Sequence, residues 1–588
     1  MTERTPMVQD TAPWLIIWAI GLAGGSYGVC YLGGTLGEGL DTGQWKTPTV
    51  SVANFIKLLT KGPAGQFPNA APSAVYSGIA IVLILALVLV GVVVWQIRRH
   101  TSTKGLAKAR DLTMLHGPKA KAKALALRDD LTPDGPFTPD DLGPLLGDLD
   151  PYGPELHASY EDSLVCVMPP RSGKSTCIAG PAVLRAPGAV VNTSNKSDVY
   201  ALTKRRRAKV GTCWTFDPQK VAFAKRAMWF DLLFDARNPE GARRLAGHFT
   251  ANLTADMNNR DFWATAAGNL LTELFHAAAI AETLSTADVL EWLSGVDRTP
   301  ADILLDHGKK AMGDHLLSTI KGAVETREGI YETARQAVAC LTDPAILDWV
   351  SPHDNLPQFK PAEFVLSKDT LYLLSKEGGG GASPLIAALC DATMRAAAMA
   401  AELRAGRLAT PLTVVLDEAC NVCKIADLPD LYSHFGSRGV ILISILQSYK
   451  QGVRVWGEHG MDALWGAATV KILGSGLDDA DFVDKLSRLV GEHKVEETSQ
   501  SHSPGNRSVT VSKQRERILP VETLRAMPKG RALLLVTGVR AAVIKLRPWY
   551  EESDKNELAE AFKVETRAIS QRALALAAGP GIGAGPSA

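Results

Sequence analysis

One short stretch of the chain, VMPPRSGKST at residues 167–176, holds the residue types that could bind a nucleotide. Gly173, Lys174 and Ser175 follow one another as they do at the end of a phosphate-binding loop. The glycine lets the backbone wrap an anion, the lysine can reach the β- and γ-phosphates, and the serine hydroxyl can hold Mg²⁺. Met168 stands where the motif has its first glycine, which is tolerable if the backbone φ there stays negative. The stretch predicts a site for ATP and Mg²⁺, with these nucleotide-binding residues: Pro169, Pro170, Arg171, Ser172, Gly173, Lys174, Ser175 and Thr176.

A phosphate loop needs a buried strand before it and a helix after it, because backbone N–H groups and the helix dipole then converge on the phosphates. Residues 163–168 (SLVCVM) are an apolar run that predicts such a strand. Residues 175–184 (STCIAGPAVL) predict the helix, which Pro181 would bend or end early.

Two further strand ends carry residues suited to nucleotide hydrolysis. Residues 412–416 (LTVVL) predict a strand that ends in Asp417 and Glu418. Asp417 would hold Mg²⁺ through water, and Glu418 would orient and deprotonate the attacking water. Residues 440–446 (VILISIL) predict a strand that ends at Gln447, whose amide could sense the γ-phosphate.

The alternative is that the first of these strands merely ends in two acids at a solvated edge. Because polar signals at three strand ends fit the carboxyl rim of a doubly wound sheet, we interpret them as one ATP hydrolase site in an α/β fold. An arginine from a neighbouring subunit would complete such a site. Arg438, nine residues before Gln447, is the candidate, and its alternative role is that of a solvated turn residue.

Length and composition limit the class of protein. A chain of 588 residues exceeds one core and predicts several domains. The formal net charge of +1 gives no overall attraction to nucleic acid, so binding would need local patches. Eight scattered cysteines suit free thiols in a reducing compartment, and the pair Cys420 and Cys423 is read as two small apolar residues rather than a zinc site.

Two uncharged stretches, residues 14–36 and 74–97, are each long enough to cross a membrane as a helix. The first could instead be a cleaved signal peptide, although it lacks a strongly basic start. Residues 98–128 carry nine Lys or Arg and one acid, which places them and the N-terminus in the cytoplasm. This basic run would be drawn to membrane lipids or would form a solvated linker helix. Residues 129–162 carry ten acids and no Lys or Arg, and they predict an extended connector.

Together these motifs resemble the type IV secretion coupling proteins of the TraG-like family, membrane-bound conjugation ATPases. The matching pieces follow the family order: PPRSGKS, residues 192–218 (NTSNKSDVYALTKRRRAKVGTCWTFDP), VVLDEACNV, residues 436–451 (GSRGVILISILQSYKQ), residues 468–492 (ATVKILGSGLDDADFVDKLSRLVGE) and residues 518–536 (ILPVETLRAMPKGRALLLV). The departures are Met168 and an alanine-rich segment after Glu418.

The resemblance implies a RecA-like P-loop nucleotide-binding domain at 163–239 and 349–550, interrupted by an inserted all-α domain at 240–348 that meets the substrate. Around them we expect a membrane anchor with two transmembrane helices at 1–100, a juxtamembrane connector at 101–162, and a C-terminal helix with a flexible tail at 551–588. Three smaller expectations concern residues 204–207 (KRRR) as a solvated helix face or a DNA contact, 498–513 as an exposed loop, and 378–383 as a flexible connector.

The resemblance further implies an ATPase of the inner cell membrane, multi-pass, with its ATPase domain in the cytoplasm. Its partners would be DNA or relaxase-bound DNA and the type IV secretion channel proteins, and its active form a homo-hexamer. Two alternatives stay open: a membrane ATPase that exports protein only, and a substrate receptor that does not hydrolyse ATP. Stimulation of hydrolysis by DNA would separate the DNA-delivering ATPase from the ATPase that exports protein only.

Overall fold

The chain divides into two compact units, residues 1–104 and 105–588. The structure is a computed structural model and describes residues 12–45, 49, 51–102, 105–251, 253, 261–376, 381–503 and 506–577. Residues 378–380 of the expected connector at 378–383 lie outside these residues, as does the expected tail after residue 577.

Unit 1 is a pair of long helices, α1 (Ala12–Thr42) and α3 (Pro72–Ser102), joined by α2 (Val52–Lys61) and the 3-10 turn η1 (Pro63–Gln66). Glycines let the two backbones touch. A Cβ added to Gly33 would lie 2.4 Å from Ile79 Cα, and one added to Gly78 would lie 2.1 Å from the Gly33 carbonyl oxygen. No larger residue fits such a contact, which is how small residues bring helices together in a membrane.

By length and composition, residues Pro72–Val92 of α3 are apolar enough to cross a membrane. Only 11% of this window is buried within the fold, so its apolar surface faces outward. The helix α15 (Ser383–Glu402) passes the same test, but 67% of it is buried and it is a core helix of unit 2. The other predicted span, 14–36, lies in α1, where the side chains of residues 12–23 are outside the described part.

In the described part of unit 2, eleven strands form one sheet with the order β2-β1-β13-β12-β9-β3-β8-β7-β4-β6-β5. Seven of them, from β9 to β5, are parallel, and the other four continue the sheet antiparallel beyond β9. Their bounds are β1 Leu145–Leu149, β2 Glu155–His157, β3 Leu164–Val167, β4 Val190–Ser194, β5 Cys213–Phe216, β6 Thr370–Leu374, β7 Leu412–Leu416, β8 Val440–Leu446, β9 Val470–Gly474, β12 Arg531–Val536 and β13 Ala542–Lys545.

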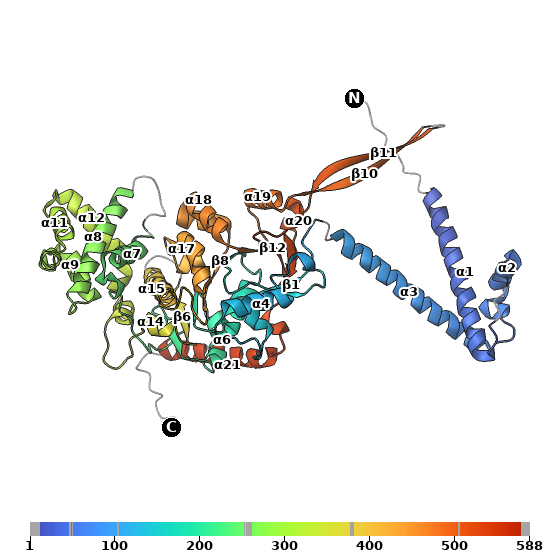
Figure 1. Ribbon diagram of the computed structural model, residues 1–588, viewed down its shortest axis with the longest axis horizontal. Helices are drawn as coiled ribbons and strands as arrows, with labels where there is room; N and C mark the ends of the chain where they lie inside the picture. Colours follow the sequence, from blue (N-terminus) through green and yellow to red (C-terminus); the bar gives the residue numbers. More distant parts are fainter. Residues whose placement is uncertain are drawn as a thin grey trace, which may run out of the picture. The chain divides into compact units, whose positions relative to one another are not determined.

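Helices cover both faces of this sheet, which is why its central strands are apolar throughout (Figure 1). One face carries the π turn η4 (Lys174–Ala179) with α5 (Gly180–Arg185) and α6 (Asp198–Arg207), packed through residues such as Ile178 and Val183. The other carries α15, α17 (Leu428–Phe435), α18 (Tyr449–Ala467) and α19 (Ala480–Val490). β3, β7 and β8 are buried at every position, and the three strands predicted from their apolar runs are confirmed.

Between Pro239 and Val350 the described residues form helices and 3-10 turns and no strand of the sheet. Figure 1 shows α8, α9, α11 and α12 together at one end of unit 2, apart from the sheet. The helices are α7 Pro239–Thr250, α8 Asp261–Ile280, α9 Thr286–Gly295, α10 Thr299–Asp306, α11 Lys310–Lys321, α12 Val324–Ala337 and α13 Pro344–Leu347. The chain returns to the sheet through α14 (Pro361–Phe364).

Two sequence-based predictions are wrong. Residues 129–162 are not an extended connector throughout, because β1 and β2 belong to the sheet and bury Leu146 and Leu156 in its core. Residues 498–513 are not a loop, because β10 (Glu492–Ser503) and β11 (Asn506–Arg517) form a long antiparallel hairpin (Figure 1). In both places charged and hydroxyl residues obscured the strand pattern.

The basic residues 204–207 in α6 are also not a solvated face. The C-terminal helix α21 (Lys555–Ala577) packs on α6, and Lys204 Nζ lies 3.2 Å from Glu565 Oε1. Arg206 pairs with Asp554 at 2.9 Å. Arg207 is 1% exposed, and its guanidinium donates to backbone carbonyls on neighbouring segments. Lys204 and Arg206 therefore hold the C-terminal segment against α6, whereas Arg207 ties α6 to the segments beside the sheet.

Candidate nucleotide-binding site

The phosphate loop joins β3 to η4 at the carboxyl end of the parallel strands. Gly173 adopts a left-handed conformation with φ of 94°, and Arg171 also has a positive φ of 65°. Ser172 is buried and its hydroxyl donates to the Pro169 carbonyl at 2.6 Å, while the Thr176 hydroxyl donates to the Gly173 carbonyl at 3.2 Å. These short-range bonds fix the loop as a compact turn.

Met168 fits the loop without backbone strain. It is not one of the residues with positive φ, so the condition for replacing the first glycine is met. Its backbone N–H donates to Leu446 O at 2.8 Å, and its side chain is fully buried. A Cβ added to Gly474 on the adjacent strand β9 would lie 3.1 Å from Met168 Cγ. The methionine therefore occupies space that a glycine on the neighbouring strand leaves open.

The helix after the loop opens with a π turn, η4, in place of an α turn, and continues as α5. Pro181 lies at the start of α5 and has no N–H to donate to the preceding turn. A proline ring also crowds the carbonyl four residues back, so the wider π turn relieves both conflicts. In place of the bend predicted at Pro181, the structure has this wider π turn just before the proline. Lys174 is the first residue of the π turn.

Asp417 is buried at the end of β7 and is held by the neighbouring strand β4. The Ser194 hydroxyl donates to Asp417 Oδ2 at 3.2 Å, and the Thr193 hydroxyl donates to the Asp417 carbonyl at 3.3 Å. No described residue bonds the other carboxylate oxygen, Oδ1, which is also buried. Burial raises the pKa of Asp417 to about 6, and the nearby Lys174 cation opposes that rise.

Glu418 gathers the polar side chains of the site. Its backbone is left-handed, with φ 57° and ψ 46°, a conformation that a non-glycine residue holds only where its surroundings enforce it. Lys174 Nζ forms a buried ion pair with Glu418 Oε1. Gln447 Nε2 donates to Glu418 Oε2 at 2.6 Å, and Asn421 Nδ2 donates to the same oxygen at 3.2 Å. The fold therefore brings together Lys174, Glu418 and Gln447, from three neighbouring elements.

These residues fit a magnesium ion that is held mainly by phosphate and water. Mg²⁺ prefers oxygen ligands and is usually bound through one or two protein groups plus substrate phosphates. The Asp417 carboxylate, with one buried oxygen unpaired among the described residues, and the Ser175 hydroxyl are such groups. The described residues contain no group of three or more His, Cys, Asp or Glu that could hold a metal by protein ligands alone.

Arg438 is not part of the site of its own subunit. It lies in the turn η8 (Gly436–Arg438), at the amino end of β8, whereas Gln447 follows the carboxyl end of that strand. At about 3.3 Å per residue, the seven-residue strand separates the two ends by roughly 23 Å. Arg438 Nη2 lies 3.0 Å from Glu402 Oε1, in an ion pair that is partly exposed.

Ser194 and Asn421 were not predicted from the sequence. Ser194 is the last residue of β4, and its contact with Asp417 spans 223 positions, so only the strand order reveals it. Asn421 is three residues after Glu418, on the short helix α16 (Ala419–Val422), and helical spacing could have suggested it.

The fold is a mixed α/β sheet with a large parallel part, and a loop of the phosphate-binding type lies at the carboxyl ends of its parallel strands. Residues 411–529 match the family model described as the TraM recognition site of TraD and TraG. A comparison with curated proteins gives no match.

Among solved structures, the chain is similar to the bacterial conjugative coupling protein TrwBdeltaN70 in an unbound form, with a TM-score of 0.52 and 19% identity over 66% of this chain and 85% of that chain. It is similar to the plasmid coupling protein TrwB in complex with an ATP analogue, ADPNP, with a TM-score of 0.50 and 19% identity over 66% and 86%. The complex of TrwB with ADP and Mg²⁺ matches with the same score and identity, over 66% and 85%. At this identity the structural likeness concerns the fold.

The match of residues 411–529 to this family model confirms the resemblance predicted from the motifs, and the solved coupling proteins share the fold.

Proposed function

We propose that the chain is a membrane-bound ATPase that couples DNA or relaxase-bound DNA to a type IV secretion channel and drives its transfer by ATP hydrolysis. The observation that carries this proposal is the cluster of Lys174, Glu418 and Gln447 beside a buried Asp417. TrwB, which shares the fold, has been solved with an ATP analogue and with ADP and Mg²⁺, and this supports the same ligands here.

The ion pair between Lys174 and Glu418 suggests how binding prepares catalysis. A γ-phosphate would compete with Glu418 for the Lys174 cation, since phosphate offers this lysine several anionic oxygens. Glu418 would then be free to accept a proton from the attacking water, while its bond from Gln447 keeps it oriented. Loss of the phosphate would let the ion pair re-form, so Gln447 could relay the change to α18.

Ser175 and Asp417 would hold Mg²⁺, which neutralises charge on the β- and γ-phosphates when it is bound. Asp417 serves this purpose only when ionised. Burial works against that state, and Lys174 and the Ser194 hydroxyl favour it.

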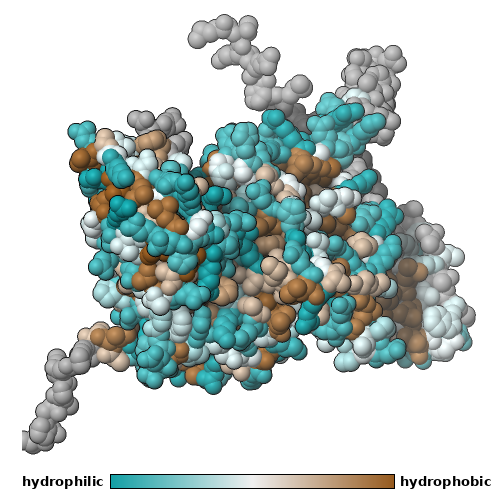
Figure 2. All heavy atoms as spheres, turned by 60° about the vertical axis from the view of Figure 1, so that its left-hand side comes forward, coloured by the Kyte–Doolittle hydropathy of each residue, from teal (hydrophilic) through white to brown (hydrophobic). Residues whose placement is uncertain are grey.

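The helical segment between Pro239 and Val350 is proposed to be the inserted all-α domain and to meet the substrate complex. Figure 2, turned to bring this side of the molecule forward, shows hydrophobic residues scattered among hydrophilic ones over the helices. Phe262 is 61% exposed and Val324 is 62% exposed. Apolar side chains scattered singly are ordinary on a protein surface, so the proposal rests on the helical composition of this segment and on its separation from the sheet.

The apolar helix α3 supports an inner-membrane anchor with the ATPase domain in the cytoplasm, and membrane lipids would surround it. The proposed active form is a homo-hexamer, in which Arg438 of one subunit would reach the site of the next.

ATP hydrolysis by the purified full chain, measured as phosphate release with and without single- and double-stranded DNA, tests the proposal. We expect Mg²⁺-dependent hydrolysis that DNA stimulates and that Lys174→Ala abolishes while membrane insertion persists. Hydrolysis that DNA leaves unchanged would favour export of protein only. Equal activity of the Lys174→Ala variant would contradict the site itself.

A further inference from the structure

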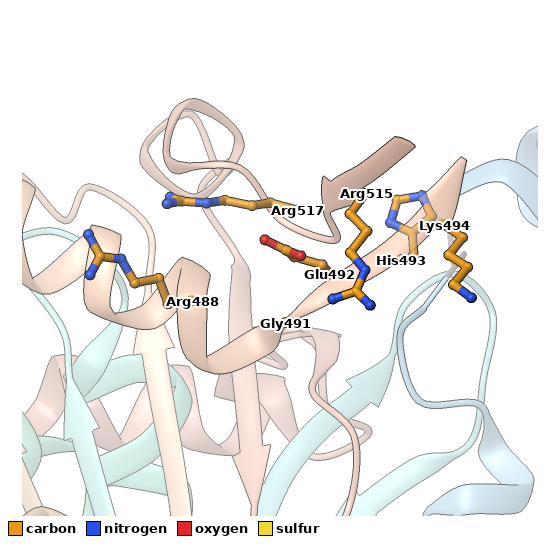
Figure 3. Close-up of a pocket in the computed structure, with 7 residues that line it drawn as sticks. All are labelled: Arg488, Gly491, Glu492, His493, Lys494, Arg515 and Arg517. Atoms are coloured by element: carbon orange, nitrogen blue, oxygen red, sulfur yellow. The ribbon is translucent and has the colours of Figure 1, made fainter. Parts of the chain in front are cut away.

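A basic cavity of about 670 Å³ lies at the base of the β10–β11 hairpin, and no residue of the phosphate loop lines it. Its lining includes four cations and one carboxylate, drawn in Figure 3: Arg488, Lys494, Arg515, Arg517 and Glu492, with His493 beside them. The cations come from the end of α19, the start of β10 and the end of β11. Such a surplus of positive charge in a cavity favours an anionic ligand.

Two of these cations lie opposite each other in the hairpin. Lys494 and Arg515 are partners in the antiparallel register, and Figure 3 shows their side chains extending in the same direction. Like charges at directly opposite positions destabilise a strand pair. Neither forms an ion pair within the described part of the chain, and both are exposed. An anion bound between them would remove this repulsion.

The rest of the cavity is held in position. Arg488 and Arg517 share Asp484, at 2.5 Å and 2.6 Å from its two carboxylate oxygens. His493 Nδ1 is buried and lacks a hydrogen-bond partner among the described residues, so it is available to a ligand oxygen. The cavity therefore contains two arginines held by Asp484 and a histidine nitrogen that a ligand could hydrogen-bond.

The base of the hairpin is tied to the first residue of unit 2. Ile518, directly after β11, donates its N–H to Gly491 O at 3.0 Å, which closes the hairpin. A Cβ added to Gly105 would lie 2.7 Å from Ile518 Cγ1, so Gly105 packs directly on this residue. Leu106, the next residue, is buried in the core of the unit.

Only a short stretch of chain separates the apolar helix from the start of unit 2. Ser102 is the last residue of α3, and Gly105 follows three residues later. An extended chain of that length spans about 11 Å at most, whatever the orientation of the two units. If α3 crosses the membrane with its basic end in the cytoplasm, Gly105 lies close to the headgroups of the cytoplasmic leaflet.

We propose that the cavity binds the phosphate of an anionic phospholipid headgroup, with Lys494 and Arg515 as its main contacts. The proposal rests on the membrane anchor of the proposed function and is independent of ATP hydrolysis. A bound headgroup would fix the hairpin, and with it the sheet, at the membrane surface.

Backbone hydrogen exchange tests this in the full chain, reconstituted in vesicles of phosphatidylcholine with or without phosphatidylglycerol. We expect exchange at residues 488–494 and 512–518 to slow by about fivefold or more with the anionic lipid, since each basic residue near such a surface strengthens binding by roughly fivefold. The Lys494→Gln/Arg515→Gln variant should lose the slowing, whereas Lys494→Arg/Arg515→Lys should retain it. Lys310→Gln/Lys321→Gln, which removes two exposed charges from α11, is the matched control and should respond like the unaltered chain.

Equal slowing in neutral vesicles, or slowing that persists in the double glutamine variant, would overturn the proposal. So would slowing that appears with DNA and without anionic lipid, because the cavity would then belong to nucleic acid. Flotation of the chain with the vesicles distinguishes a failure of the lipid site from a failure of the membrane anchor. A chain that floats without any slowing contradicts the lipid site alone, whereas one that does not float contradicts the anchor as well.

Discussion

The buried carboxylate of Asp417 lowers the stability of the folded protein at neutral pH. Its carboxyl is buried and its pKa is raised to about 6 from an ordinary value of 3.8, chiefly by desolvation. The folded state therefore binds the proton more tightly than the unfolded state. Stability falls as the pH rises from about 4 through 6 and is lower above that window by about 3 kcal/mol. A magnesium ion at the site would offset this cost.

Asp417→Asn should remove the buried charge and keep the bond from Ser194, so the variant should lose hydrolysis and gain stability. Thermal unfolding with a chelator at pH 7.5 should give a higher Tm for the variant. The corresponding gain in the free energy of unfolding should be at most about 3 kcal/mol. The difference should shrink toward pH 4, where the native carboxyl is protonated. A lower Tm for the variant at pH 7.5 would contradict this account of Asp417.

Residue types at strand ends predicted much of the site, because parallel strands place their carboxyl ends on one edge of a sheet. Lys174, Glu418 and Gln447 were expected there, and the structure brings them together. Ser194 could not be predicted in this way, because its role depends on β4 lying beside β7. Nor does a residue pattern alone reveal that Lys174 pairs directly with Glu418.

Among the strands, those that are buried on both faces were predicted from the sequence, and the more exposed ones were not. β3, β7 and β8 are apolar because helices cover both of their faces. β1 lies toward the edge of the sheet, and Asp148 and Asp150 flank its last leucine. The β10–β11 ladder is polar apart from three valines. Backbone hydrogen bonds rather than an apolar face define that hairpin, so periodicity gave no signal.

The contact between β3 and β9 explains how the loop tolerates Met168. We expect Met168→Ala to cost about 2–5 kcal/mol, as loss of a buried methionine does. Gly474→Ala should cost about 1 kcal/mol or more, because its Cβ would press on Met168 Cγ. In the double variant the new methyl group of residue 474 enters the space that the methionine side chain vacates. The double variant should therefore lose less stability than the two single variants lose together.

Denaturant unfolding of the four proteins in this double-mutant cycle gives the coupling energy. Strict additivity would mean that Met168 and Gly474 do not share this space. ATP binding should persist in every variant, since the loop is expected to hold phosphate through backbone N–H groups and Lys174.

At the scale of the whole molecule, the boundary between the units predicts where the chain can be cut. A fragment that starts at residue 101 keeps Leu106 and Leu112, which are buried in unit 2, and the bond from Ala107 N to Ala541 O. It should be soluble and hydrolyse ATP. A fragment that starts at residue 113 lacks these contacts and should unfold at a lower temperature. Sedimentation of the first fragment with neutral phosphatidylcholine vesicles, which offer no anionic headgroup, would contradict an anchor confined to unit 1.

Assembly is tested at Arg438, which lies far from the site of its own subunit. If a neighbour uses it, Arg438→Ala should lose turnover by roughly 10³-fold or more and still bind ATP. Mixing it with Lys174→Ala protein should restore part of the activity, because each subunit supplies what the other lacks. A co-assembled mixture without activity would leave Arg438 as the partner of Glu402 alone.

The central claim is that Glu418, held by Lys174 and Gln447, is the catalytic carboxylate of an ATPase. Bound ATP and released phosphate, measured on one sample of Glu418→Gln protein with Mg²⁺, test it most directly. The variant should bind ATP as well as the unaltered chain, because glutamine keeps the shape of the side chain and does not compete with phosphate for the Lys174 cation. Its phosphate release should fall to background. Hydrolysis at the rate of the unaltered chain would contradict the claim.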